Sequence, residues 1–262
     1  MRRGKSEIEL VVLILLNAAL WGPWCRGLFG VSRLGAPWRV RAAIAGTAAL
    51  ALAMILVVLL TASSRDVRGS VYYILSYEAF GGVWLAGALG LFPFFGVSLR
   101  DDVIERRNRA AFWVASGALL GSAVCFAGAN AGDGPGPAAV VFCAALASTA
   151  FFLVWFLAEV AGAHWTDAVT IDRDPASGLR LGSLLLSAGV AFGSAESGDW
   201  VSAGATVRDF FVRGWPLAPA LGVALLAERP LRRASGLLGG WLAAAVYLLL
   251  TAACIALERR TR

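Results

Sequence analysis

The chain has 262 residues, of which 59% are hydrophobic and only 15% are charged, and its mean hydropathy is +0.73. Soluble globular proteins contain about 45–50% apolar and about 25% charged residues, so the composition excludes a soluble enzyme and predicts an integral membrane protein. The net charge of +6 reflects basic residues that are all arginines except Lys5. Because they lie mostly at the ends of apolar runs, they are typical of orientation signals and do not indicate nucleic-acid binding.

A helix needs about 20 apolar residues to cross the hydrocarbon core, and the chain up to Glu159 contains one weak and four clear candidate spans. The weak segment, Ile8 to Trp24, is short and contains Asn17. Acidic residues precede it and tryptophans follow it, which does not fit a cleaved signal peptide, so we expect a tilted or partly inserted helix. The clear spans lie between Arg41 and Arg65, Glu78 and Arg100, Arg109 and Asp133, and Asp133 and Glu159.

The sixth candidate begins at Asp174 and Pro175, which are suited to the N-cap and the first position of a helix. It continues to Ala195 and contains Arg180, whose side chain we expect to extend to the lipid headgroups. A later span lies between Arg233 and Glu258.

The seventh candidate, Val207 to Ala227, carries charges in its first two turns. Asp209 and Arg213 are four residues apart and can pair on one helix face, while Pro216 and Pro219 predict a kink or break. The sequence therefore predicts an all-α, polytopic transmembrane helix bundle of about eight helices, or seven if the first segment does not span.

The distribution of basic residues predicts the orientation. With eight spans, the loops on one side carry 13 basic residues and those on the other carry 10; without the first span the numbers become 16 and 7. In both cases the loops 99–109 and 163–180 fall on the richer side, which the positive-inside rule makes cytoplasmic.

An internal repeat appears when the chain is shifted by 66 positions. Over Asp101 to Asp133, 11 of 33 residues are identical to those 66 positions later, where about three would match by chance in such a composition. We expect a tandem duplication of a two-helix module, with modules at 71–134 and 135–200, an N-terminal extension at 1–70 and a C-terminal helix pair at 201–262. The copies would be parallel, related by an axis along the membrane normal. Equivalent turn positions are Asp101 and Asp167, Arg107 and Arg173, and Asn108 and Asp174.

Small residues mark the second helix of each module. Gly117 and Gly121 lie in the first copy, and Gly178, Gly182, Gly189 and Gly193 lie in the second. Glycines at such spacing let helix backbones approach closely in lipid, which predicts tight packing within the chain or between chains.

These motifs resemble the YjfL-like family, whose domain is described as domain of unknown function 350. The resemblance rests on Asn108-Arg-Ala-Ala111 before the Gly117 to Gly121 stretch and on Asp174 before Ala176-Ser-Gly-Leu-Arg-Leu-Gly182. It covers Val71 to Trp200. Asp174-Pro175 departs from the family pattern and helices are added at both ends, so a divergent or extended member is expected. The resemblance implies the bacterial inner (cytoplasmic) membrane and a link to membrane stress or a PspA-like peripheral partner, with no established activity.

Glu78 is the main candidate for an intramembrane functional group, because ionisable residues inside the bilayer are costly. It lies seven residues after Val71, about 10 Å into a helix, beside Ser76 and Tyr77. It could bind a cation or a proton on a conduction path. The alternative is that it faces another helix, protonated or hydrogen-bonded to a tyrosine or serine.

No catalytic, metal or cofactor site is expected. The single histidine, His164, has no partner for metal binding, and the motifs G-x-S-x-G, H-E-x-x-H and Walker A are absent. The leading hypothesis is a non-enzymatic membrane scaffold or stress-linked subunit that forms a homo-oligomer or binds another membrane protein. The alternative is an ion channel or small-solute transporter that uses the carboxylate of Glu78.

Overall fold

The computed structural model describes residues 2–29, 37–234 and 236–261. Within these ranges the fold is all-α, and eight helical segments, with α8 and α9 counted together as one, are long and apolar enough to cross a membrane, which confirms the predicted class. The helices are α1 (Arg2–Phe29), α2 (Trp38–Thr61), α3 (Arg65–Arg68), α4 (Val71–Leu91), α5 (Arg109–Ala129), α6 (Pro137–Ala158), α7 (Pro175–Glu196), α8 (Ala203–Arg213), α9 (Ala218–Ala234) and α10 (Leu237–Arg260).

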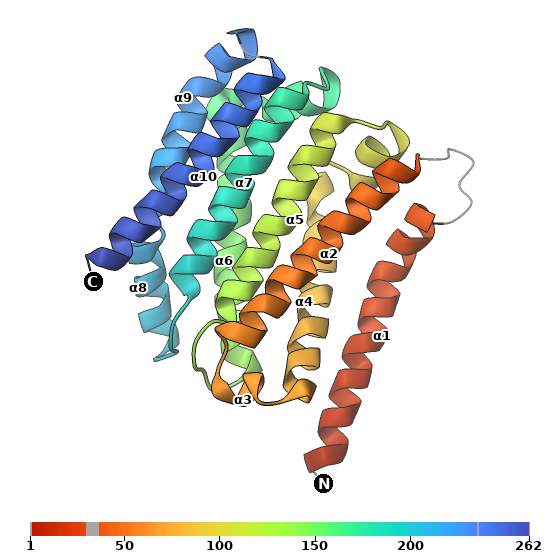
Figure 1. Ribbon diagram of the computed structural model, residues 1–262, viewed down its shortest axis with the longest axis vertical. Helices are drawn as coiled ribbons and strands as arrows, with labels where there is room; N and C mark the ends of the chain where they lie inside the picture. Colours follow the sequence, from red (N-terminus) through yellow and green to blue (C-terminus); the bar gives the residue numbers. More distant parts are fainter. Residues whose placement is uncertain (1, 30–36, 235, 262) are drawn as a thin grey trace.

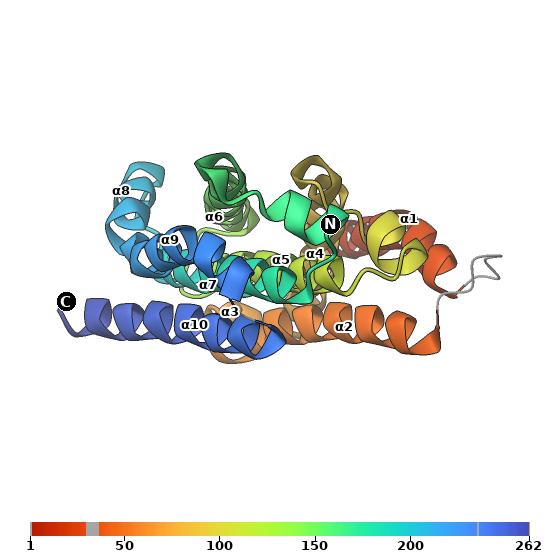
Figure 2. The same ribbon diagram turned by 90° about the horizontal axis from the view of Figure 1, so that it is seen from above.

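Helices α5 and α7 form the centre of the bundle. They lie side by side, with α2 packed on α5 and α10 packed on α7 (Figure 1). Seen from above, α2 and α10 lie in one layer on one face of the central pair, and α4 and α6 lie on the opposite face (Figure 2). In the spanning stretches, 72% of α5 and 89% of α7 are buried inside the molecule, against 39% or less for the other six. The central pair is therefore the part of the bundle that is shielded from lipid.

Glycines allow the central helices to touch through their backbones. A Cβ atom at Gly117 would collide with the backbone of Gly182, and one at Gly189 would collide with the backbone of Gly121. Further along, Gly128 and Gly193 meet in the same way. These glycines therefore pack within the chain, where a larger residue would separate the two backbones.

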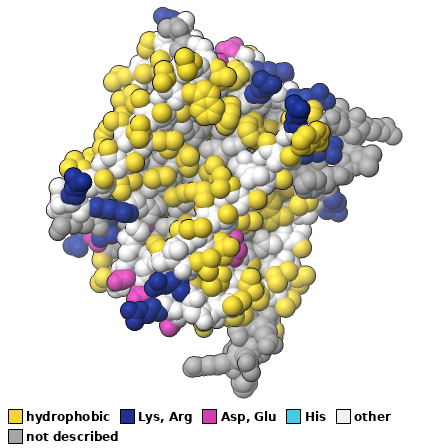
Figure 3. Space-filling model, viewed as in Figure 1, with side chains coloured by type: hydrophobic (Ala, Val, Ile, Leu, Met, Phe, Trp, Pro, Cys, Tyr) yellow, Lys and Arg dark blue, Asp and Glu magenta, His cyan; other side chains and the backbone are white. Residues whose placement is uncertain are grey.

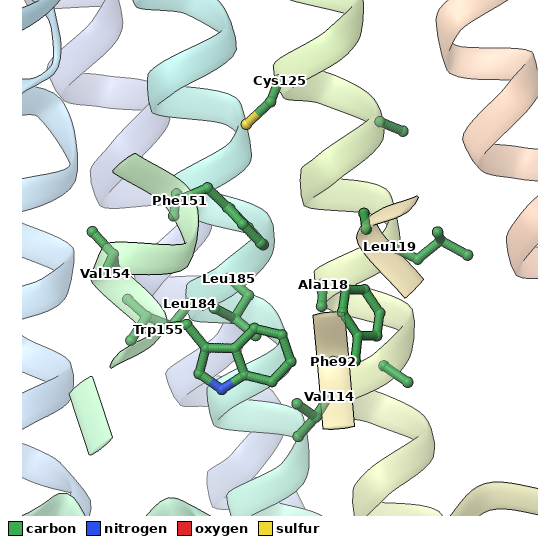
Figure 4. Packing of buried hydrophobic residues seen from close by; sticks show 14 of the residues in the cluster. Phe92, Val114, Ala118, Leu119, Cys125, Phe151, Val154, Trp155, Leu184 and Leu185 are labelled. Carbon is green, nitrogen blue, oxygen red and sulfur yellow. The ribbon is translucent and has the colours of Figure 1, made fainter. Parts of the chain in front are cut away.

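Aromatic side chains fill the space between the central pair and α6. The rings of Phe151 and Trp155 on α6 point toward Leu184 and Leu185 of α7 (Figure 4). Trp155 is 1% exposed and its ring centroid lies 5.4 Å from that of Phe92, which follows α4. Large rings from the outer helices thus compensate for the small side chains of the centre.

Two turns at one end of the bundle precede the central helices α5 and α7 and cap their N-termini. Before α5 and α7 the chain forms the short helical segments η2 (Leu99–Glu105) and η4 (Asp167–Ile171). Asn108 Oδ1 accepts hydrogen bonds from Ala110 N (2.9 Å) and Ala111 N (3.2 Å), which caps α5. Such caps satisfy backbone N–H groups that have no partner within the helix.

Asp174 caps α7 in the equivalent way. Its carboxylate accepts from the backbone N atoms of Ala176 (3.1 Å) and Ser177 (2.9 Å). Burial acts to raise the pKa of this carboxyl, but the hydrogen bonds from Ser177 and Ala176 and the charge of Arg180 outweigh it, so the pKa of Asp174 is lowered from its ordinary value. The cap is therefore a carboxylate at neutral pH.

The two turns share backbone features at a spacing of 66 residues. Arg107 and Arg173 both adopt a left-handed conformation with φ of 54°. Asn108 N donates to Asp102 O, and Asp174 N donates to Ala168 O, both at 2.9 Å. The tandem duplication stays a prediction, and these correspondences are consistent with it.

The first and seventh segments are irregular in different ways. α1 runs through Pro23 and contacts α4, where Asn17 Nδ2 donates to Ala79 O (2.7 Å) and Trp21 Nε1 donates to Gly82 O (2.9 Å). The predicted break after α8 is confirmed, because a 3-10 turn at Trp215–Leu217 separates α8 from α9.

Candidate functional site

The structure corrects the expected position of Arg180. Its side chain is fully buried and does not extend to the headgroups. Arg180 Nε donates to Glu228 Oε2 (2.6 Å) and Nη2 donates to Glu228 Oε1 (3.0 Å), so the guanidinium is held by a carboxylate of α9. Ser177 Oγ lies within hydrogen-bond distance of both groups, and Arg232 Nη2 lies 3.4 Å from Glu228 Oε1. The expectation failed because it considered only the residues of the arginine's own helix.

The residues around Glu78 do not form one site. Ser76 and Tyr77 line a hollow between α1, α4 and α6, and Glu78 is not among its lining residues. Ser76 Oγ donates to Tyr72 O of its own helix at 2.9 Å. Glu78 is half-buried, and its Oε2 is shielded from solvent without a hydrogen-bond partner. Ser76 and Tyr77 therefore share one hollow, Tyr77 also lines the cavity described next, and Glu78 lines neither.

A cavity of about 110 Å³ lies at the other end of the bundle from the η2 and η4 turns. It is formed where α5, α6, α7 and α8 come together near α3 (Figure 1). Four carboxylates and one guanidinium line it: Asp133, Glu196, Asp199, Asp209 and Arg213. Its lining is therefore predominantly acidic.

Glu196 is the most buried of these carboxylates. It is the last residue of α7 and is 7% exposed, and no nitrogen or oxygen donor reaches either of its oxygens. Its neighbour is the Cys143 thiol of α6, which is only a weak hydrogen-bond donor. The Arg213 guanidinium lies 3.5 Å from Asp209 Oδ2 and donates to Ser197 O (3.2 Å), and its charge acts on Glu196 without a salt bridge to it. A carboxylate buried in this way is costly, which marks Glu196 as a functional candidate.

The rim of the cavity is made by two Gly-Asp turns that hold each other. Asp199 Oδ1 accepts a hydrogen bond from Asp133 N, and Trp200 N donates to Asp133 O, both at 2.8 Å. Gly132 and Gly198 have φ of 117° and 139°, a region that side-chain-bearing residues rarely adopt. The rim is therefore fixed by backbone geometry as well as by hydrogen bonds.

The cavity is suited to binding a cation or a proton. Glu196 supplies a buried carboxylate without a salt bridge, and Asn130, which is 7% exposed, lies in the same lining. Within the described residues, no group of three or more His, Cys, Asp or Glu side chains is placed to hold a metal ion. The arrangement therefore offers one buried charge surrounded by polar groups.

Sequence patterns did not identify Glu196 as a buried residue or Glu228 as the partner of Arg180. Glu196 ends an apolar helix, a position at which charged residues ordinarily reach water, so its burial depends on α6 and α8. Arg180 and Glu228 are 48 residues apart, and no local motif connects them. In both cases the decisive information is tertiary.

The fold and surface define a multi-pass integral membrane protein. Hydrophobic side chains cover the middle of the face in Figure 3, and most basic side chains lie toward its margins. Comparisons of the chain with protein-family models, with curated proteins and with solved structures found no match. The resemblance to the YjfL-like family therefore stays a prediction based on the quoted motifs.

Proposed function

We propose that the protein is a non-enzymatic membrane protein that binds a small cation at Glu196, as part of an ion channel or small-solute transporter. The observation that carries this proposal is the buried carboxylate of Glu196 in the lining of an acidic cavity, where only the weakly donating Cys143 thiol lies beside it. A cation would satisfy the carboxylate and remove the cost of its burial. We place the cation site at Glu196 because it lines an acidic cavity, and the candidate at Glu78 stays a prediction.

The charge of the lining favours cations over anions. Four acidic residues and one arginine surround the cavity, and a cleft lined by one sign of charge concentrates ligands of the opposite sign. An anion would meet repulsion from Asp133 and Asp199 before it reached Glu196.

The scaffold or stress-linked subunit, which was the leading hypothesis from the sequence, loses part of its support. That hypothesis drew on the glycine faces of α5 and α7, which were expected to pack within the chain or between chains, and these faces contact each other inside the chain. A homo-oligomer would need another surface. A PspA-like peripheral partner rests on the YjfL-like resemblance alone.

The proposed location is the inner membrane of a bacterium, with loops 99–109 and 163–180 in the cytoplasm. The charge distribution and the family resemblance support this orientation. The cavity of Glu196 would then open toward the opposite, non-cytoplasmic side.

Cys143 provides a reporter for this proposal because it lines the cavity beside Glu196. In a variant with Cys25 and Cys254 replaced by serine, a cationic thiosulfonate should modify Cys143 about tenfold faster than an anionic one. Glu196→Gln should reduce this preference, and Glu78→Gln is the matched control that should leave it unchanged. Equal rates for both reagents in the parent variant would contradict the cation site.

Transport is tested separately in proteoliposomes. Flux of sodium, potassium or a small organic ammonium ion should depend on the protein, fall in Glu196→Gln and persist in Glu78→Gln. Absence of flux for all three ions, together with intact charge preference at Cys143, would restrict the role to binding.

A further inference from the structure

An apolar groove runs along the outer face of the central helix pair. Its walls are α2 and α10, which lie in the same layer (Figure 2), and its floor is made by α5 and α7. Two hollows of about 540 and 480 Å³ adjoin there and share Val190, Ser194 and Arg259 in their linings. They form one continuous groove, which is distinct from the cavity of Glu196.

The groove exists because the floor carries small side chains. Ala127 and Gly128 of α5 and Gly193 and Ser194 of α7 lie between the larger residues of the walls. Met54 and Val57 form the α2 wall, and Ile255 belongs to the α10 wall. Apart from Ser194, Ser197 and Arg259, the described residues that line the groove are apolar or glycine, so its natural contents are hydrocarbon.

One basic side chain, that of Arg259, lies at the end of this groove. Arg259 lies in the last turn of α10, is exposed, and its Nη2 lies 3.3 Å from Ser194 Oγ on the floor. This contact directs the guanidinium toward the groove. Neither hollow has an acidic residue among its described lining residues, so no carboxylate of the lining competes with an anionic group from outside the chain for Arg259.

We propose that the groove binds an anionic phospholipid, with one acyl chain along the floor and the phosphate on Arg259. A guanidinium pairs well with phosphate oxygens, and arginine at the end of a membrane helix lies near the depth of the headgroups. A zwitterionic lipid would bring an ammonium group that finds no carboxylate in the lining, so a net negative headgroup such as phosphatidylglycerol is preferred.

The size of the groove argues against a helix from a second copy as its occupant. A helix with its side chains is about 10–12 Å wide, so the two hollows together would hold only about two turns. An acyl chain is narrow and flexible enough to follow the floor between the walls. The proposal does not depend on the function of the Glu196 cavity.

The test measures phosphatidylglycerol bound to the full-length protein. Protein extracted in mild detergent is mixed with phosphatidylglycerol or phosphatidylethanolamine, and bound lipid is counted by native mass spectrometry. Arg259→Gln should weaken phosphatidylglycerol binding about fivefold, the effect of one basic residue near an anionic lipid surface, and Arg259→Lys should retain most of it. Val57→Trp, which fills the groove and keeps Arg259, should also release the lipid. Arg208→Gln removes an exposed arginine of α8 and should change nothing.

Three results would overturn the proposal. Equal loss of lipid in Arg208→Gln would show that overall positive charge holds it. Equal binding of the two lipids by the wild type would remove the role of the anionic headgroup. If Val57→Trp left lipid binding unchanged and converted a dimer to a monomer, the groove would be an interface between copies of the chain.

Discussion

Arg180 and Glu228 show how a charged residue is retained inside the bundle. Both side chains are fully buried, and their two hydrogen bonds are supported by Ser177 and Arg232. Removing charges from water is expensive, and mutual attraction offsets the cost only when geometry and hydrogen bonding are good. The pair therefore joins α7 to α9 without any helix-packing motif.

We expect Glu228→Gln to destabilise the protein by about 3–5 kcal/mol, because it leaves Arg180 buried and without its main charge partner. Thermal unfolding in detergent measures this loss. The double variant Arg180→Met with Glu228→Met should be more stable than Glu228→Gln, since it leaves no buried charge. A double variant that is less stable than Glu228→Gln would show that the pair is needed for more than charge neutrality.

Individual buried charges were the least predictable features. The hydropathy pattern identified Glu78 because it lies within an apolar segment, but Glu196 and Glu228 lie near helix ends, where charge is ordinary. Their burial results from α6, α8 and α10 packing around them. A single sequence predicts the helices, but it does not show which other helices pack against each helix end.

At the scale of whole elements, the contact between α5 and α7 has a regular form. Gly117 meets Gly182, 65 residues later, whereas Gly189 meets Gly121, 68 residues earlier. These spacings lie on either side of 66, as expected when two equivalent surfaces meet across a two-fold axis. The contact thus supports the proposed parallel duplication.

We expect Gly182→Ala to destabilise the protein by about 1–3 kcal/mol, the usual cost of overpacking. The added methyl group would collide with the backbone carbonyl of Trp113, which cannot rotate away. Gly90→Ala is the matched control, because nothing lies within 4 Å of its added carbon and alanine is favoured over glycine in a helix. Denaturant titration in mixed micelles compares the two. A loss of similar size at Gly90 would mean that the added methyl group acts through lipid contacts.

Element boundaries were the most predictable part of the fold. Charged residues flank most of the clear spans, although Glu78, expected at the start of one, lies inside α4. Asp174 capped α7 as expected, and Pro216 lies in the turn that interrupts the seventh segment. These features are local, because capping and proline geometry depend on neighbouring residues only. Which helices become central could not be read from hydropathy, since α7 is the most buried helix and has the lowest mean hydropathy of the eight spans, 1.3.

At the scale of the molecule, the two ends of the bundle differ in chemistry. The η2 and η4 turns lie at one end, and the acidic cavity lies at the other. The proposed orientation places the turns in the cytoplasm and the cavity on the opposite side. A membrane potential that is negative inside would then draw cations toward the cavity.

Cysteine accessibility tests this orientation. In a variant with Cys25, Cys143 and Cys254 replaced by serine, an impermeant maleimide added to intact cells should label Pro135→Cys and should not label Glu105→Cys or Asp172→Cys. All three positions are exposed at the ends of helices. After the membrane is opened, all three should react. Labelling of Glu105→Cys and Asp172→Cys in intact cells would show that the orientation is opposite to the proposed one.

The glycine contact at the centre limits how this protein can change. A mutation that enlarges one side of an ordinary contact can be compensated by a smaller residue on the other side. Where Gly117 meets Gly182 no smaller residue exists, so an enlargement on either helix has no compensating substitution. Residues of the outer helices can be substituted and their side chains can repack. The distance between α5 and α7 is instead fixed by the absence of side chains at their contact. Sequence drift should therefore be concentrated in the surrounding helices, and the central pair should be the last part to vary.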